Sequence, residues 1–225
     1  MLKVNFAANN CNQIHDDRCY LRDRNKESLR ALYPAPNNQL IGVKTVDQAK
    51  GHPDAELYID LDFTNDTARI LSLSGLLPKP VIVNAVTETL EQLGYPFTRI
   101  NGWPGFPERS VHELVTNKPD QIKELYTQLG REYQIVPDTP GMIGARILAT
   151  IINEAWYTWE EEVSTKEEID TAMKLGTNYP MGPFEWGQRI GLDKIAGLLT
   201  VLGRENERYT PSERLLEAAK SLKYD

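Results

Sequence analysis

The spacing of hydrophobic residues changes near residue 138. Before that point, short apolar or β-branched runs alternate with segments of helical spacing, a pattern that predicts strands alternating with helices. Such alternation favours an open, mostly parallel sheet covered on both faces. The predicted strands are residues 2–7, 18–22, 57–63 and 81–83, and the predicted helices are 26–32, 46–51 and 87–93, the last ending at Gly94.

From Pro140 onward the pattern is that of consecutive helices. Apolar residues recur every fourth position from Ile143 to Ala155, and a second apolar stripe runs from Leu148 to Trp156. A helix that is apolar on most of its circumference belongs at the centre of a bundle. Residues 164–167 form a capping box that opens the next helix, and Gly176 is its expected left-handed stop.

In that next helix, Ile169, Ala172 and Met173 are expected to face inward, and two more helices are expected over 193–202 and 211–222. The sequence therefore predicts two domains, an α/β domain over 1–137 and a helical domain over 138–225.

The most specific motifs lie in the helical part. Residues 140–146 read PGMIGAR, residues 172–186 read AMKLGTNYPMGPFEW, and residues 190–193 read IGLD. Together these segments resemble the C-terminal domain of the 3-hydroxyacyl-CoA dehydrogenase family, which acts in fatty acid metabolism. The resemblance implies that residues 1–137 form a shortened, degenerate Rossmann-like domain. It also implies a homodimer formed through the helical domain, which lines one wall of an acyl-CoA cleft.

The family binds NAD in its N-terminal domain, and this chain departs from that pattern. It contains no Gly-x-Gly-x-x-Gly, its first glycine is Gly42, and residues 7–12 read AANNCN where the loop is expected. If 18–22 is the second strand, the first crossover is short and Asp23 is the candidate ribose ligand. The alternative, that Asp23 caps a helix starting at Arg24, is favoured. We therefore expect no cofactor, or NAD if the family activity is retained.

The family's catalytic base is a histidine in a Gly-x-His-Phe motif. Residues 102–107 read GWPGFP and place Pro104, which cannot accept a proton, at that position. The family's glutamate partner corresponds to Glu113. His112 is then either a repositioned base or an exposed histidine without a partner, because adjacent strand residues point to opposite faces.

Two polar groups complete the family's site. Asn84 corresponds to the asparagine of a Ser-Asn-Thr-Ser segment, although it also suits a turn after a strand. The second asparagine position reads Ala145. Glu113, Asn84 and His112 are thus the candidate catalytic residues.

We therefore expect a 3-hydroxyacyl-CoA dehydrogenase-like protein with a degenerate active site and weak or absent NAD-dependent oxidation. One alternative is an active oxidoreductase that acts on a 3-hydroxyacyl-CoA or a small hydroxy acid, with His112 and Glu113 as a rearranged pair. The other alternative is a non-catalytic protein that binds an acyl-CoA-like ligand or a partner.

Composition narrows the range of partners. A net charge of -7 and a pI near 5.1 disfavour binding to nucleic acid. Two cysteines without metal-ligand spacing predict no zinc site and no disulfide framework, and fit a reducing cytoplasm. No apolar run is long enough to cross a membrane.

Overall fold

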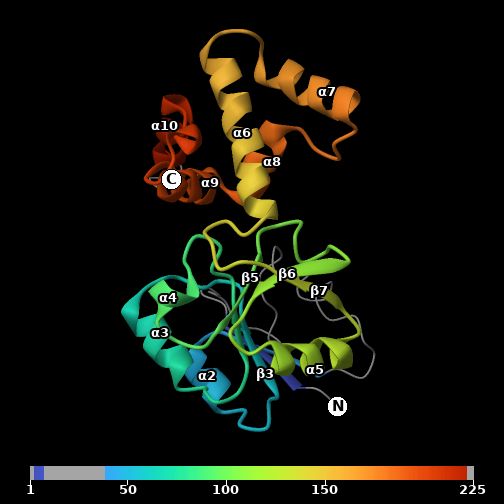
Figure 1. The fold of residues 1–225 in the computed structure, drawn as a ribbon, viewed down its shortest axis with the longest axis vertical. Helices are drawn as coiled ribbons and strands as arrows, with labels where there is room; N and C mark the ends of the chain where they lie inside the picture. Colours follow the sequence, from blue (N-terminus) through green and yellow to red (C-terminus); the bar gives the residue numbers. More distant parts are fainter. Residues whose placement is uncertain (1–2, 8–38, 222–225) are drawn as a thin grey trace, which may run out of the picture. The chain divides into compact units, whose positions relative to one another are not determined.

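A computed structural model describes residues 3–7 and 39–221. The chain divides into two compact units, residues 1–142 and 143–225 (Figure 1). The change of pattern in the sequence placed this boundary at 137/138. The difference concerns the segment 138–142, which makes its backbone contacts with the first unit: the N–H of Gly141 donates to the Val86 carbonyl at 2.7 Å.

The first unit is built on a seven-stranded sheet in the order β2-β1-β3-β4-β5-β6-β7. The strands β2, β1, β3, β4 and β5 run parallel, β6 is antiparallel to β5, and β7 is parallel to β6. The expectation of an open, mostly parallel sheet is therefore confirmed. The strands are β1 Lys3–Ala7, β2 Gln39–Val43, β3 Leu57–Asp60, β4 Val81–Val83, β5 Thr98–Ile100, β6 Val111–Val115 and β7 Glu132–Ile135.

Helices cover both faces of this sheet (Figure 1). On one face Tyr58, Val81 and Val83 pack with apolar residues of α2, α3 and α4. On the other face Leu57 and Ile82 pack with apolar residues of α5. All residues of β3 and β4 are buried, as expected for strands between two helical layers. The helices are α2 Val46–Lys50, α3 Thr67–Ser74, α4 Leu90–Leu93 and α5 Pro119–Leu129.

The strand beside β1 corrects one step of the sequence argument. The strand predicted over 18–22 and the helix predicted over 26–32 lie outside the described residues. The parallel neighbour of β1 is β2, Gln39–Val43, so residues 8–38 connect the pair. Parallel neighbours need a crossover of about a dozen residues or more. The inference that this crossover is too short is therefore wrong, because it counted to residue 18 instead of Gln39.

The second unit is a helical bundle around α6. This helix contacts each of α7, α8, α9 and α10, so its predicted central position is confirmed. Its buried face carries Ala145, Ala149 and Ile152, whereas Ile143 and Ile147 are 44% and 56% exposed. The helices are α6 Gly144–Glu160, α7 Lys166–Thr177, α8 Pro183–Ile190, α9 Leu192–Gly203 and α10 Glu213–Ser221, with a 3-10 turn at Glu207–Tyr209.

The ends of α7 differ from the prediction by one and two residues. Its capping box pairs Thr165 with Glu168 instead of Ser164 with Glu167, and the Ser164 hydroxyl also donates to Glu168. The left-handed residue at its end is Asn178, with φ 55°, so the helix continues through Gly176. Ile169 is buried and Met173 half-buried, but Ala172, which was expected to face inward, is exposed.

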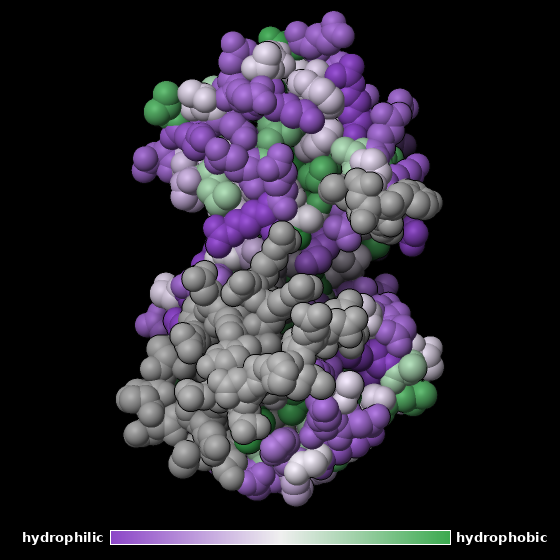
Figure 2. Space-filling view, turned by 180° about the vertical axis from the view of Figure 1, so that it is seen from behind, coloured by the Kyte–Doolittle hydropathy of each residue, from purple (hydrophilic) through white to green (hydrophobic). Residues whose placement is uncertain are grey.

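The surface of this second unit is mainly hydrophilic with small hydrophobic areas on the face that Figure 2 shows. In the described part of the chain, no helix combines the length and apolarity that crossing a membrane requires.

Candidate functional site at the carboxyl end of the sheet

Three neighbouring parallel strands, β3, β4 and β5, end at the same edge of the sheet, where open α/β sheets hold their ligands. Asn84 follows β4 and joins the three ends. Its Nδ2 donates to the carbonyl oxygen of Leu61 at 3.0 Å, and its Oδ1 accepts from the N–H of Gly102 at 2.9 Å. The asparagine predicted from sequence therefore lies at this edge, with both halves of its amide bonded to backbone.

Gly102 is required by this contact. A Cβ atom at position 102 would lie 2.7 Å from Cγ of Asn84, so any side chain there would push the two strand ends apart. Before it lies Asn101, a buried polar residue that the sequence argument missed. No signal in the sequence marked it, because the short strand that precedes it, β5, was not predicted.

The segment after Gly102 holds the position where the resemblance places a base. The N–H of Phe106 donates to the Trp103 carbonyl at 2.9 Å, and Gly105 has φ 93°. Proline in the second position and glycine with positive φ in the third define a type II turn. Trp103 and Phe106 on either side are buried. Pro104 therefore serves the turn, and the position carries no proton acceptor.

His112 lies on β6 and is only 3% exposed, so the expectation of an exposed histidine without a partner is wrong. Its Nε2 lies 3.1 Å from the carbonyl oxygen of Pro107, and its Nδ1 lies 3.3 Å from the hydroxyl of Tyr126. Because a carbonyl only accepts, Nε2 carries the proton and Nδ1 accepts from the tyrosine. Burial lowers the pKa of His112. The ring is thus neutral with both nitrogens in use.

Glu113 is the neighbour of His112 on β6 and is half-buried. Alternation along the strand places the two side chains on opposite faces of the sheet, as the sequence argument expected. The structure does not bring His112 and Glu113 together as a pair.

Charged side chains near this edge are paired. Asp60, at the end of β3, receives two hydrogen bonds from the guanidinium of Arg69, both at 2.7 Å. Burial raises the pKa of the Asp60 carboxyl, and the paired guanidinium opposes that rise. This bidentate pair adds no net charge to the edge.

Arg99, on β5, is fully buried and links two segments of the first unit. It donates to the carbonyl oxygens of Ala85 at 2.8 Å and Val86 at 3.2 Å, and it forms an ion pair with Asp138. The Asp138 carboxylate also accepts from the N–H of Leu90 at the start of α4. Burial lowers the pKa of Arg99, and Asp138 opposes this. This cation therefore holds the chain after β4 against residue 138.

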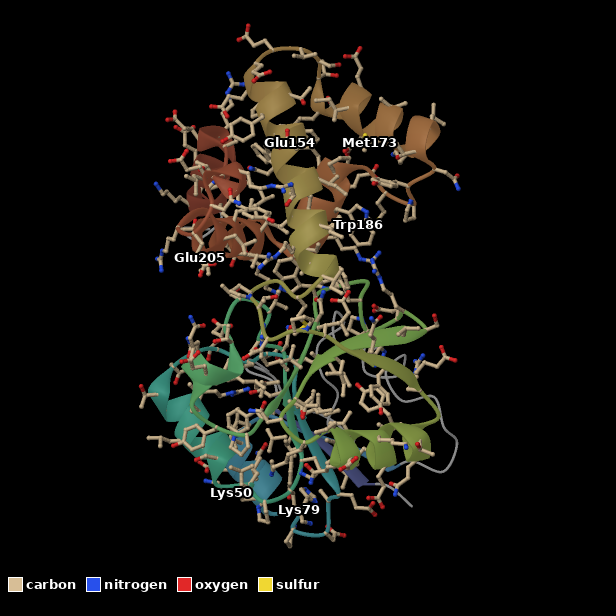
Figure 3. The ribbon with its side chains drawn as sticks, in the orientation of Figure 1. Lys50, Lys79, Glu154, Met173, Trp186 and Glu205 are labelled. Atoms are coloured by element: carbon tan, nitrogen blue, oxygen red, sulfur yellow. The ribbon has the colours of Figure 1, made fainter. Side chains whose placement is uncertain are left out.

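In the second unit, the family-like signature forms a helix cap. The carboxylate of Asp170 on α7 accepts from the N–H groups of Phe184 at 2.8 Å and Glu185 at 3.1 Å, at the start of α8. Figure 3 marks two further residues of the signature, Met173 on α7 and Trp186 on α8. These contacts give the signature a structural role. Ala145, at the family's second asparagine position, is completely buried and offers no polar group.

The place for a dinucleotide in such a sheet is the topological switch point, which here lies between β1 and β3, because the chain continues from β1 to β2 on one side and then to β3 on the other. The residues that follow β1, including the ribose candidate Asp23, lie outside the described residues. The sequence there lacks the glycines that let backbone N–H groups approach a pyrophosphate. No three His, Cys, Asp or Glu side chains within 39–221 are grouped to hold a metal ion.

Comparison with known sequences agrees with the motifs. The family model described as 3-hydroxyacyl-CoA dehydrogenase, C-terminal domain, matches residues 141–224. A probable 3-hydroxybutyryl-CoA dehydrogenase of Deinococcus radiodurans is 38% identical over 231 residues, which cover 90% of this chain and 83% of that protein. The 3-hydroxybutyryl-CoA dehydrogenase of Bradyrhizobium diazoefficiens is 42% identical over 97 residues, which cover 42% of this chain but only 33% of that protein. The match to the Bradyrhizobium protein thus spans only about a third of its length.

Solved structures share the fold. The (S)-3-hydroxybutyryl-CoA dehydrogenase of Ralstonia eutropha superposes with a TM-score of 0.67 at 23% identity, over 81% of this chain and 70% of that chain. The 3-hydroxybutyryl-CoA dehydrogenase of Escherichia coli gives a TM-score of 0.56 at 32% identity, over 64% of this chain and 32% of that chain. The match to the Deinococcus protein, at 38% identity over 83% of its length, shows that the chain belongs to the 3-hydroxyacyl-CoA dehydrogenase family.

Proposed function

We propose that this protein binds an acyl-CoA-like ligand on the family fold, and that its NAD-dependent oxidation of 3-hydroxyacyl-CoA is weak or absent. The observation that carries the proposal is the state of His112. Both of its ring nitrogens are engaged, with Pro107 and Tyr126, inside the first unit. It therefore offers no lone pair to a substrate hydroxyl.

Oxidation of a 3-hydroxyl group requires a base within hydrogen-bond reach of the hydroxyl proton. At the ends of β3, β4 and β5 the residues that the resemblance assigns to the site fail this requirement, and both carboxylate oxygens of Asp60 are bonded to Arg69. Pro104 has no acceptor on its side chain, and the Asn84 amide is not a base and is bonded to Leu61 and Gly102. Loss of a general base typically lowers the rate by about 10² to 10⁴-fold.

NAD, if bound, would supply the acceptor for the hydride that leaves the substrate carbon. The support for weak NAD binding is the sequence after β1, which has no glycine before Gly42. A side chain at each position of the phosphate loop keeps the backbone away from the pyrophosphate. We therefore expect NAD(H) to bind in the millimolar range or not at all.

One alternative has an observation in its favour. The Deinococcus relative is named a probable 3-hydroxybutyryl-CoA dehydrogenase, and it is 38% identical over most of both chains. This supports an active oxidoreductase on a 3-hydroxyacyl-CoA or a small hydroxy acid. In that alternative His112 would act with Glu113, and Asn84 would hold the substrate oxygen. His112 would have to give up its contact with Tyr126 or Pro107 to act as a base.

The proposal also includes an oligomeric state and a cellular location. We expect a homodimer formed through the second unit, in the cytoplasm. Support for the dimer comes from two isoleucines, Ile143 directly before α6 and Ile147 on α6, which remain exposed in the isolated chain. A non-catalytic role through such a face, with another protein as partner, is the remaining alternative.

The test combines a rate with two binding measurements. Reduction of acetoacetyl-CoA by NADH is followed for the wild type and for His112→Ala, beside the Deinococcus relative under the same conditions. Calorimetry measures acetoacetyl-CoA binding, and quenching of tryptophan fluorescence measures NADH binding. We expect thioester binding, with rates equally low for both forms. A wild-type rate close to that of the relative that falls in His112→Ala would establish the active alternative.

If the protein binds no thioester, only the non-catalytic role with another protein as partner would remain. Equal, high rates for wild type and His112→Ala would reject both the proposed loss of activity and the role of His112.

A further inference from the structure

Asn101 carries a buried hydrogen-bond donor that the first unit leaves unused. The residue is 3% exposed and follows β5 directly. Its Oδ1 accepts from the N–H of Trp103 at 3.2 Å, while among the described residues its Nδ2 has no hydrogen-bond partner. The orientation of the amide is fixed by this contact, because a flipped amide would set two donors against each other.

Such a group is unusual in a folded protein. The large majority of buried side-chain polar atoms have a partner, and one without a partner calls for an explanation, such as a catalytic role or a bound water or ion. The chain directly after Asn101 is also held in place. Gly102 is bonded to Asn84, and the type II turn from Trp103 to Phe106 follows. The unused N–H is therefore at a defined point on the edge of the sheet.

We propose that Asn101 is a specificity-determining residue whose Nδ2 donates a hydrogen bond to the 3-oxo oxygen of a bound 3-oxoacyl-CoA. The inference rests on the proposed acyl-CoA ligand. An amide N–H is a neutral donor and matches a carbonyl oxygen, which only accepts. The resemblance places the group that meets the substrate's 3-oxygen in residues 102–107, directly beside Asn101.

Burial supports this role. A polar group in a site closed to water discriminates strongly against an analogue that lacks its partner, because the group is then left without a hydrogen bond. An acyl chain without the 3-oxygen leaves Nδ2 unpaired. Access to Asn101 requires movement of side chains next to it, of the kind that ligand binding commonly produces.

The test measures discrimination between two thioesters. Calorimetry at pH 8 gives the dissociation constants of acetoacetyl-CoA and butyryl-CoA, which share the thioester carbonyl and differ in the 3-oxygen. We expect the wild type to bind acetoacetyl-CoA about tenfold more tightly, the factor that one added hydrogen bond typically gives. Asn101→Asp replaces the donor by an acceptor and keeps the contact with Trp103. It should bind the two thioesters within about twofold of each other.

Two further variants secure the result. Asn101→Ala removes the donor without adding a buried charge, and should lose the preference in the same way. Asn117→Asp, at an exposed asparagine of the same unit, should keep the wild-type preference. In addition, the side-chain amide signal of Asn101 in a ¹⁵N-labelled wild type, identified by its loss in Asn101→Ala, should shift with acetoacetyl-CoA and not with butyryl-CoA.

The outcomes separate the two proposals. If the wild type binds both thioesters equally, or if Asn101→Asp weakens both to the same extent, the role of Asn101 is refuted while the acyl-CoA proposal stands. An amide signal that stays unchanged on addition of acetoacetyl-CoA has the same meaning. If the wild type binds neither thioester, both proposals are refuted.

Discussion

Protonation of the buried His112 should make the stability of the first unit depend on pH. Its ring lies edge-on to the ring of Tyr126, with centroids 5.8 Å apart, and both ring nitrogens are hydrogen-bonded within the protein. Burial is the largest cause of its lowered pKa, and burial likewise raises the pKa of the Tyr126 hydroxyl far above its usual value. The pair is therefore stable only while both groups are uncharged.

Stability should accordingly depend on pH through this residue. The pKa of His112 is lower in the folded state than its value of about 6.5 in the unfolded chain, so below pH 6.5 the unfolded chain binds more protons. The contribution of His112 is complete above that pH and falls as the pH drops toward the folded pKa. At pH 8, His112→Gln should be less stable by about 1–2 kcal/mol, because one of two hydrogen bonds is lost. This deficit should shrink as the pH falls to 5.

Urea unfolding at pH 5, 6, 7 and 8 measures the effect. His52→Gln is the control, because the contact of His52 with the Tyr58 hydroxyl uses its backbone carbonyl, which the substitution keeps. A deficit for His112→Gln that stays constant from pH 8 to pH 5 would contradict the buried, neutral state of the ring.

The sequence identified individual polar residues but not their hydrogen-bond partners. It singled out Asn84, which lies at the strand ends, and alternation correctly separated His112 from Glu113. The contacts of Asn84 with Leu61 and Gly102 join segments far apart in the sequence, and no local pattern predicts them. Asn101 and Arg99 gave no signal, because a single polar residue beside a short strand is typical of a surface position.

The connection between α7 and α8 shows what the family-like signature does as an element. Asp170 caps α8 from the neighbouring helix, and Gly182 lies against that carboxylate. A Cβ atom at position 182 would lie 2.2 Å from Cγ of Asp170, closer than any two non-bonded carbon atoms can approach. Glu185 adds hydrogen bonds from the Gly182 N–H at 2.9 Å and from Lys174 at 2.6 Å. The glycine of the signature is therefore required by close approach.

A double-mutant cycle tests this packing. Gly182→Ala should destabilise the protein by about 1–3 kcal/mol, because the added methyl group overpacks the cap. Asp170→Ala should cost about 0.5–2 kcal/mol through loss of the cap. In the Asp170→Ala background the additional cost of Gly182→Ala should be smaller but not zero, because Cγ and Oδ1 of residue 170 are gone while its Cβ, 2.3 Å from the added methyl group, remains. Thermal or urea unfolding of the four proteins gives the coupling.

Gly197→Ala is the matched control, since a Cβ at that helical position meets no atom within 4 Å. It should stabilise the protein by about 0.5–1 kcal/mol. Additive effects of Gly182→Ala and Asp170→Ala would show that the two residues are not in contact.

β1 and β4 were predicted to within one residue, whereas the helix predicted over 87–93 covers only Leu90–Leu93. β4 is an apolar run after prolines, and α4 begins at a Thr89 cap and ends at Gly94 with φ 69°. β2, β5, β7, α3, α5 and α8 were not predicted. β5 has three residues and contains Arg99, and β7 is a mostly exposed strand at the end of the sheet, without alternating burial. Strands of this kind are defined by their partners more than by their own residues.

The proposed dimer has a direct test. Ile147 on α6 is 56% exposed, and Leu71 on α3 in the first unit is 55% exposed. If the second unit forms the dimer contact, Ile147→Glu buries a charge in that contact and should shift the protein to a monomer. Leu71→Glu, with equal exposure, should leave the dimer intact. Light scattering coupled to size-exclusion chromatography measures both.

A wild type that stays monomeric at protein concentrations up to about 100 μM would contradict the dimer. That concentration is about 100 times a dissociation constant of about 1 μM. A dimer disrupted equally by both substitutions would place the contact elsewhere.

The proposed loss of the family's base, on a retained family fold, predicts slow reduction of acetoacetyl-CoA. A single-turnover experiment tests this most directly, with protein in excess over acetoacetyl-CoA, saturating NADH, and 3-hydroxybutyryl-CoA measured by mass spectrometry. We predict product formation at least about 10²-fold slower than with the Deinococcus relative, and unchanged by His112→Gln. Conversion as fast as that of the relative, abolished by His112→Gln, would contradict the account.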